Sequence, residues 1–202
     1  MHPRLRLTLM LVATIAIATA AAVVLLVGPG GGAGATTRGF AGSVRPDVPT
    51  RDFALRDQDG RLVRLSALRG RPVVVTFLYT VCRDTCPLMA DQIRGALDRL
   101  GGPPPPVLAV SVDPRNDTPA RAARFVARHG LTGRMDYLLG TSAQLQPVWR
   151  QFGIQPQTGG TALSDHSAYV VLLDRRLRQR VAFPISELTP EALAHDIRRL
   201  ES

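Results

Sequence analysis

The stretch PVVVTFLYTVCRDTCPLM, residues 72–89, decides the fold. It begins with a continuous apolar and β-branched run over 72–79, which is typical of a strand buried on both faces of a sheet. A short polar loop follows and carries the only two cysteines of the chain, Cys82 and Cys86. A helix is predicted next, over 87–100, because its apolar residues share one face, a proline opens it and two glycines follow it. The cysteines therefore lie between a buried strand and the N-terminus of a helix.

Strands and helices alternate outward from this stretch. The sequence predicts, in order, a hairpin turning at Asp59-Gly60, the strand 72–79, the helix 87–100, a strand over 107–112, a helix capped by Thr118-Pro119 and ending near His129-Gly130, a short strand near 135–139, a helix containing Trp149 that Pro147 starts or kinks, an antiparallel pair turning at 174–176, and a last helix capped by Thr189-Pro190. This order predicts an α/β domain with a mainly parallel central sheet and an added β-hairpin at its edge. Active sites of such sheets lie at the carboxyl ends of strands, where the cysteine loop is placed, and this arrangement is thioredoxin-like.

The N-terminal quarter of the chain differs in composition from the rest. Residues 1–6 are basic, and the 21 residues 7–27 carry no charge; an α-helix needs about 20 residues to cross a bilayer. We interpret 7–27 as a membrane anchor with a cytoplasmic N-terminus, and a cleaved signal peptide is the alternative. The glycine- and proline-rich residues 28–50 predict a flexible tether. Residues 51–202 are then one domain on the periplasmic or extracytoplasmic side.

The formal net charge of the chain is +9, and arginine supplies all 25 of its basic side chains. These arginines are scattered and rarely stand beside aromatic residues, so nucleic acid is not an expected partner. A solvated basic surface of this kind favours anionic lipid or an acidic protein.

The C-x-x-x-C pair has three interpretations. A structural disulfide suits an exported domain, but a bridge across three residues constrains the unfolded chain little. A redox role is favoured because a thiol near a helix N-terminus and beside Arg83 gains thiolate character. A metal site is the third, since thiolates are soft ligands for Cu(I), zinc or iron–sulfur clusters. Zinc and clusters generally want four strong ligands, whereas Cu(I) accepts two or three, so a third ligand is sought among the histidines.

The chain has four histidines. His2 precedes the apolar segment, and His129 and His195 are predicted at a helix C-terminus and on a polar helix face. His166 follows Asp165 in a loop at the entrance to a strand. These residues alone leave open whether His166 is a ligand or an ordinary loop histidine.

Four segments, in this order, resemble the Sco/SenC family of membrane-anchored copper-binding assembly proteins: VVVTFLYTVCRDTCPLM at 73–89, VSVDPRNDTP at 110–119, LTG at 131–133 and DHSAYVVLLD at 165–174. The resemblance covers about residues 50–200 and the anchor. C-x-x-x-C-P alone is moderately specific, and its combination with D-T-P and D-H-S is strong. One departure is Arg83, where many relatives have proline; we expect a less rigid and more positive loop.

The resemblance implies a thioredoxin-like fold that binds copper through Cys82, Cys86 and His166. It implies supporting roles for Asp84, inside the cysteine loop, and for Asp165, which would orient the imidazole. The implied partner is the copper-containing subunit of cytochrome c oxidase, to which the protein passes copper or whose cysteines it reduces. Other copper chaperones and thiol-disulfide reductases are further candidate partners.

Other functions remain open at this point. The main alternative is a general thiol-disulfide oxidoreductase of the thioredoxin superfamily without a role in copper delivery. A redox or copper sensor that acts through protein contacts is a third class, and no threonine-cysteine arrangement typical of a peroxidase is present. Asp113 and Thr118-Pro119 are interpreted as residues that shape the backbone.

Overall fold

The computed structural model describes residues 39–154 and 169–202. The basic N-terminus, the predicted anchor and the first part of the predicted tether lie outside these ranges. Within the two ranges, no helix combines the length and the apolar character needed to cross a membrane.

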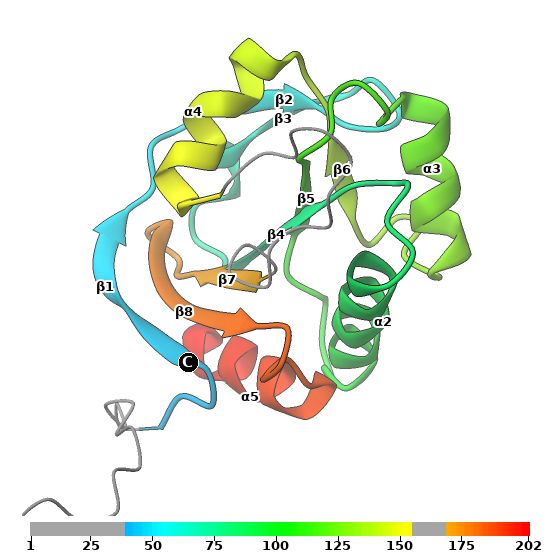
Figure 1. Ribbon diagram of the computed structural model, residues 1–202. Coiled ribbons are helices and arrows are strands. Elements are labelled where there is room, and N and C mark those ends of the chain that lie inside the picture. Colours follow the sequence, from blue (N-terminus) through cyan, green and yellow to red (C-terminus); the bar gives the residue numbers. More distant parts are fainter. Residues whose placement is uncertain (1–38, 155–168) are drawn as a thin grey trace, which may run out of the picture. The chain divides into compact units, whose positions relative to one another are not determined.

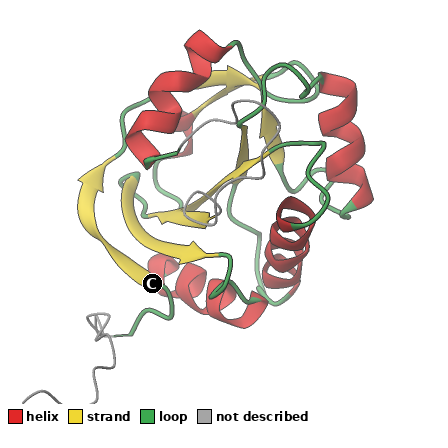
Figure 2. Ribbon diagram, viewed as in Figure 1, coloured by secondary structure: helices red, strands yellow, loops and turns green. Residues whose placement is uncertain are grey.

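A mixed sheet of six strands forms the centre of the described domain (Figures 1 and 2). Its order is β1-β8-β7-β4-β5-β6. The pairs β4–β5 and β5–β6 are parallel, and the three remaining neighbouring pairs are antiparallel. The strands are β1 (Ser43–Pro49), β4 (Val73–Leu78), β5 (Val107–Ser111), β6 (Asp136–Leu138), β7 (Tyr169–Leu173) and β8 (Arg178–Pro184), and a separate hairpin pairs β2 (Ala54–Arg56) with β3 (Leu62–Arg64).

The prediction of a mainly parallel sheet is therefore wrong, because three of its five pairings are antiparallel. The late hairpin β7–β8 forms as predicted, but it does not lie at an edge. Strand β7 pairs with the central strand β4, and β1 pairs with the outer side of β8. Both turn predictions hold: β2–β3 turns around Asp59-Gly60, and Asp174 accepts hydrogen bonds from the N–H groups of Arg176 (2.8 Å) and Arg178 (3.0 Å) between β7 and β8.

Strand β1 occupies residues 43–49, so the prediction of a flexible tether over 28–50 is wrong for this part. Its side chains are mostly exposed, it contains two prolines, and its register shifts between Val44 and Val48. An edge strand tolerates proline because one row of its backbone groups faces solvent. Just before β1, the buried carboxylate of Asp196 accepts the N–H groups of Ala41 (2.8 Å) and Gly42 (3.0 Å), so the chain is already part of the domain there.

The central strand β4 is buried along its whole length, as its apolar sequence predicts. Helices cover the sheet: Phe77 of β4 packs on Phe152 of α4, with ring centroids 5.2 Å apart, and Phe125 of α3 packs on Tyr137 of β6 at 5.9 Å. Each such apolar side chain contributes roughly 1.5–3 kcal/mol when it leaves water. This burial fixes the carboxyl end of β4, from which the cysteine loop departs.

The helices are α2 (Thr85–Asp98), α3 (Pro119–Arg128), α4 (Ser142–Phe152), α5 (Pro190–Glu201) and the 3-10 turn η1 (Leu65–Leu68). The predicted caps of α3 and α5 are confirmed: Thr118 and Thr189 each accept a backbone N–H from the first helical turn, and a proline follows each. Pro147 lies inside α4 and does not start it; Thr141 caps that helix instead. Helix α2 begins two residues before Pro87, so Cys86 belongs to its first turn.

Candidate metal and thiol centre

The cysteine loop leaves the carboxyl end of β4 and returns to the domain as α2. Cys82 is partly exposed in the loop, whereas Cys86 is fully buried in the first turn of the helix. Both are free thiols. The burial of the strand and of the helix start thus fixes one sulfur inside the core and leaves the other accessible.

Hydrogen bonds converge on the sulfur of Cys82. The backbone N–H of Cys86 donates to Cys82 Sγ at 3.2 Å. The Cys86 thiol, in the first place, and also the Tyr79 side chain and the Asp84 backbone N–H lower the pKa of Cys82 to about 5, although partial burial works against them. Cys82 is therefore a thiolate at neutral pH, which is the nucleophilic and metal-binding form.

Cys86 has the opposite character. Its thiol hydrogen bond to Cys82, together with its burial, raises the pKa of Cys86 far above that of an ordinary thiol. The pair thus holds one proton between two sulfurs, with the charge on the exposed one. A reactive thiol was predicted at this pair, and the hydrogen bonds favour Cys82 for that character.

A buried carboxylate lies behind the loop. Asp117, which directly precedes the cap of α3, accepts the backbone N–H of Thr80 at 2.7 Å and the hydroxyls of Ser111 at 2.6 Å and Tyr137 at 3.1 Å. Burial raises the pKa of the Asp117 carboxyl, and these hydrogen bonds partly oppose that rise. Trp149 Nε1 donates to the carbonyl of Ser111 at 2.9 Å and extends the network to α4.

Sequence reasoning missed Asp117. It lies in the D-x-x-x-D-T-P segment, where Asp113 and Thr118-Pro119 were expected to shape the backbone. That expectation holds: Asp113 accepts the side-chain N–H of Asn116 at 2.7 Å, and Thr118 caps α3. The available signal was a second carboxylate just after the strand that neighbours β4, at the same edge of the sheet as the cysteines.

Asp84 lies at the N-cap position of α2, but its side chain accepts no capping hydrogen bond. Its carboxylate is exposed, and its backbone N–H is the part that contacts Cys82. Val81, Arg83 and Leu88 are also exposed around the loop, so a partner can approach Cys82 from solvent.

His166 and Asp165 lie outside the described residues, so their predicted roles stay predictions. Within the described ranges, no group of three or more metal-ligating side chains comes together. His129 and His195 instead contact carboxylates, with Nδ1 of His129 at 2.9 Å from Asp91 and Nδ1 of His195 at 2.8 Å from Asp196. The described residues thus offer two candidate soft ligands, Cys82 and Cys86, without a third metal-ligating side chain grouped with them.

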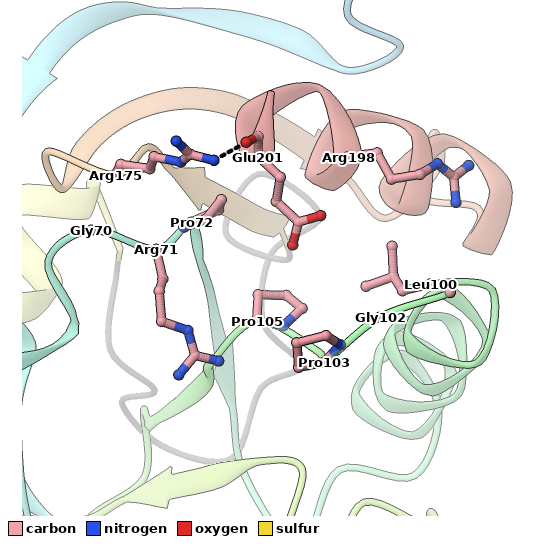
Figure 3. A pocket seen from close by; sticks show the side chains of 11 residues that line it. Gly70, Arg71, Pro72, Leu100, Gly102, Pro103, Pro105, Arg175, Arg198 and Glu201 are labelled. Atoms are coloured by element: carbon pink, nitrogen blue, oxygen red, sulfur yellow. Dashed lines mark hydrogen bonds between the residues drawn. The ribbon is translucent and has the colours of Figure 1, made fainter.

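A cavity of about 640 Å³ lies at the other end of β4, where Pro72 precedes the strand (Figure 3). Arginines from three segments line it, but each donates to a backbone carbonyl: Arg71 to Pro104 at 2.9 Å, Arg175 to Glu201, and Arg198 to Arg99 at 3.2 Å. The strand separates this cavity from the cysteines by about 20 Å, since six residues each rise about 3.3 Å. The cavity is not part of the thiol centre.

The geometry allows two kinds of chemistry at one pair of sulfurs. A partly exposed thiolate with a second thiol in contact is a nucleophile with its resolving partner, able to exchange with a disulfide. The same two sulfurs are soft ligands suited to Cu(I).

Comparisons with known proteins find one family. The profile of the SCO1/SenC family matches residues 43–202. Among curated relatives, the mitochondrial protein SCO2 homolog of Bos taurus is 32% identical over 131 residues, which are 60% of this chain and 48% of the relative. The chain spans about half the length of the first curated relatives that it matches.

Solved structures show the same fold. BsSco, described as a member of the Sco family of cytochrome c oxidase assembly proteins with a disulfide switch, superposes with a TM-score of 0.68 at 23% identity, over 77% of this chain and 95% of BsSco. Bradyrhizobium japonicum ScoI, solved with copper bound, superposes with a TM-score of 0.58 at 28% identity, over 76% of this chain and 99% of ScoI.

The mixed sheet, with a pair of thiols between its central strand and the following helix, defines a thioredoxin-like α/β protein. The match over residues 43–202 assigns it further: the chain belongs to the SCO1/SenC family.

Proposed function

We propose that the protein is a copper chaperone that acts on the binuclear copper site of a cytochrome c oxidase subunit. The observation that carries the proposal is the unequal thiol pair, with an exposed thiolate at Cys82 in contact with a buried thiol at Cys86. Membership of a family whose solved members include a copper-bound protein and an oxidase assembly protein supports the choice of metal and partner.

The donor set fits Cu(I) as cargo. Cys82 offers a preformed thiolate, and Cys86 has to lose its proton when it becomes a second ligand. In this proposal His166 supplies the third ligand and Asp165 orients its imidazole. A site with only three protein ligands, one of them exposed, allows transfer to the thiols of a partner by ligand exchange.

The same pair supports a second act on the same partner. The Cys82 thiolate attacks a disulfide of the partner, which forms a mixed disulfide and releases one partner thiolate. Cys86 then displaces the second partner sulfur, so the pair ends as a disulfide and two electrons have passed to the partner. This step needs no metal and no histidine, and it is also the reaction of the alternative function, a general thiol-disulfide oxidoreductase.

The proposal places the domain on the periplasmic or extracytoplasmic side of a cell membrane, held by the apolar segment 7–27. That location follows from the sequence pattern, with uncharged residues after a basic N-terminus. It brings the cysteine loop into the compartment where a membrane-bound oxidase subunit exposes a copper-binding domain.

The experiment that tests the proposal is a Cu(I) titration of the reduced full chain in nonionic detergent, in competition with a chelator of known affinity. We expect one copper per chain, and we expect His166→Ala to weaken Cu(I) binding by about ten-fold or more, the loss of roughly 1.4 kcal/mol. His195→Ala is the matched control, because His195 contacts a carboxylate on its own helix.

A His166→Ala chain that binds Cu(I) as tightly as the wild type would contradict the ligand assignment. If neither form binds Cu(I) tightly, and the reduced protein turns over a generic disulfide, the oxidoreductase replaces the chaperone as the function.

A further inference from the structure

One peptide group links Asp117 to the reactive cysteine. The peptide between Tyr79 and Thr80 donates its N–H to Asp117 Oδ1 at 2.7 Å. The carbonyl of this same peptide accepts the N–H of Cys82 at 3.3 Å. Because a peptide group is planar, these two hydrogen bonds are coupled. Asp117 fixes the orientation of the Tyr79–Thr80 peptide, and the carbonyl of that peptide in turn fixes the backbone of Cys82.

Asp117 is itself held rigidly. Its Oδ2 accepts the hydroxyls of Ser111 and Tyr137, and its own N–H donates to the carbonyl of Asp113 at 2.9 Å. Only 7% of the residue is exposed, and Tyr137 is fully buried. The carboxylate therefore connects the cysteine loop to β5, β6 and the start of α3.

All three of these contacts to the carboxylate come from neutral groups in the part of the chain that the structure describes. A buried carboxylate costs free energy, and hydrogen bonds from neutral donors offset only part of this cost. A carboxylate that served stability alone would be better placed beside an arginine, of which the chain has many. Its position behind the loop calls for another explanation.

We propose that Asp117 is the positioning residue of the cysteine loop: it orients the Tyr79–Thr80 peptide so that Cys82 presents its sulfur to Cys86 and to solvent. This inference rests on the proposed function for its copper readout. The positioning itself is a property of the reduced protein and is measured without copper.

The chain offers variants that separate positioning from stability. Ser111→Ala and Tyr137→Phe each remove a hydrogen bond from Oδ2 but leave the bond from Thr80 to Oδ1. Asp117→Ala removes all three. Asp117→Asn keeps an acceptor for Thr80, and the two hydroxyls can rotate to accept from its amide, since a hydroxyl both donates and accepts.

The experiment uses the reduced full chain in nonionic detergent and three readouts: hydrogen exchange at the amides of Thr80 and Cys82 by NMR, Cu(I) affinity by chelator competition, and thermal unfolding. We expect Asp117→Ala to speed exchange at both amides, and to weaken Cu(I) binding, by about ten-fold or more, as loss of a charge-assisted hydrogen bond implies. Asp117→Asn restores both to within about three-fold of the wild type.

Ser111→Ala and Tyr137→Phe are expected to lower the unfolding temperature while leaving amide exchange and Cu(I) affinity within about two-fold of the wild type. The proposal is overturned if Asp117→Ala changes neither exchange nor affinity. It is equally overturned if the two controls change them as much as Asp117→Ala does, because the network then acts only through stability.

If Asp117→Ala does not fold, Thr80→Pro carries the same test, because proline has no N–H to donate to Asp117. Thr80→Pro is then expected to speed hydrogen exchange at the Cys82 amide and to weaken Cu(I) binding. A Thr80→Pro chain with wild-type exchange and wild-type Cu(I) affinity overturns the proposal. A wild-type chain that fails to bind copper would refute the proposed function, while the exchange data would still decide the role of Asp117.

Discussion

Hydrogen-bond donors are arranged differently at the two ends of strand β4. At the carboxyl end, donors from Cys86, Tyr79 and Asp84 converge on one sulfur atom. At the other end, arginines surround a large cavity, but they donate to three different backbone carbonyls (Figure 3). The thiol whose pKa is lowered lies at the cysteine end and not at the cavity.

In this domain the candidate reactive site is marked by donors that converge on one atom, whereas the donors around the cavity are directed at separate backbone carbonyls. The arginines Arg175 and Arg198 donate to carbonyls at the ends of α5 and α2, where cations and donors are normally found. Their arrangement is explained by those helix ends. The donors at Cys82 instead stabilise a thiolate and lower the pKa of this thiol, and a perturbed pKa of this kind is typical of functional sites.

The largest effect on the difference between the two ends is expected when the exposed thiolate is removed. At pH 7, Cys82→Ser should slow alkylation of the reduced full chain by iodoacetamide by about 100-fold or more, because the remaining thiol is buried and protonated. Cys86→Ser should keep a fast-reacting Cys82. Mass spectrometry of the alkylated chain assigns the site, and equal rates for the two variants would break the distinction between the sulfurs.

The smallest effect is expected at the opposite end of the strand. Arg198→Gln removes a donor to the last carbonyls of α2 and should cost about 1 kcal/mol or less of unfolding free energy, as measured by denaturant titration. Arg124→Gln, an exposed arginine on α3, is the matched control and should change stability by less than about 0.5 kcal/mol. Neither variant should alter alkylation of Cys82. A several-fold change with Arg198→Gln would show that the two ends are coupled.

The local elements of this fold could be predicted because their signals are local. A few adjacent residues determine each of these elements: the buried run of β4, the threonine-proline caps of α3 and α5, and both hairpin turns. Strand direction was not predictable in this way, because it depends on which strands pair across the sheet. The hairpin β7–β8 was expected at an edge because β1, with its prolines and exposed side chains, lacks an apolar alternation.

In the candidate site, too, the local features could be predicted and the long-range contacts could not. A reactive thiol was predicted from the position of Cys82 and Cys86 at a strand end, and the lowered pKa of Cys82 supports that prediction. Of the two expected causes, the helix N-terminus acts through the backbone N–H of Cys86, whereas the groups that lower the pKa most are hydrogen-bond donors and not Arg83. Asp117 could not be recognised because its contact with Thr80 joins residues 37 positions apart. A carboxylate before a helix cap looks in sequence like an ordinary turn residue.

The central claim is that the two sulfurs share one proton unequally, and a thiolate titration tests it most directly. Ultraviolet absorbance of the reduced full chain should show one thiolate forming with a midpoint near pH 5, which is Cys82, and no second thiolate below pH 9, because the pKa of Cys86 is raised. Cys86→Ala should move the first midpoint upward, since the Cys86 thiol is the main cause of the lowered pKa of Cys82. Two thiols that titrate together between pH 8 and 9 would contradict the account.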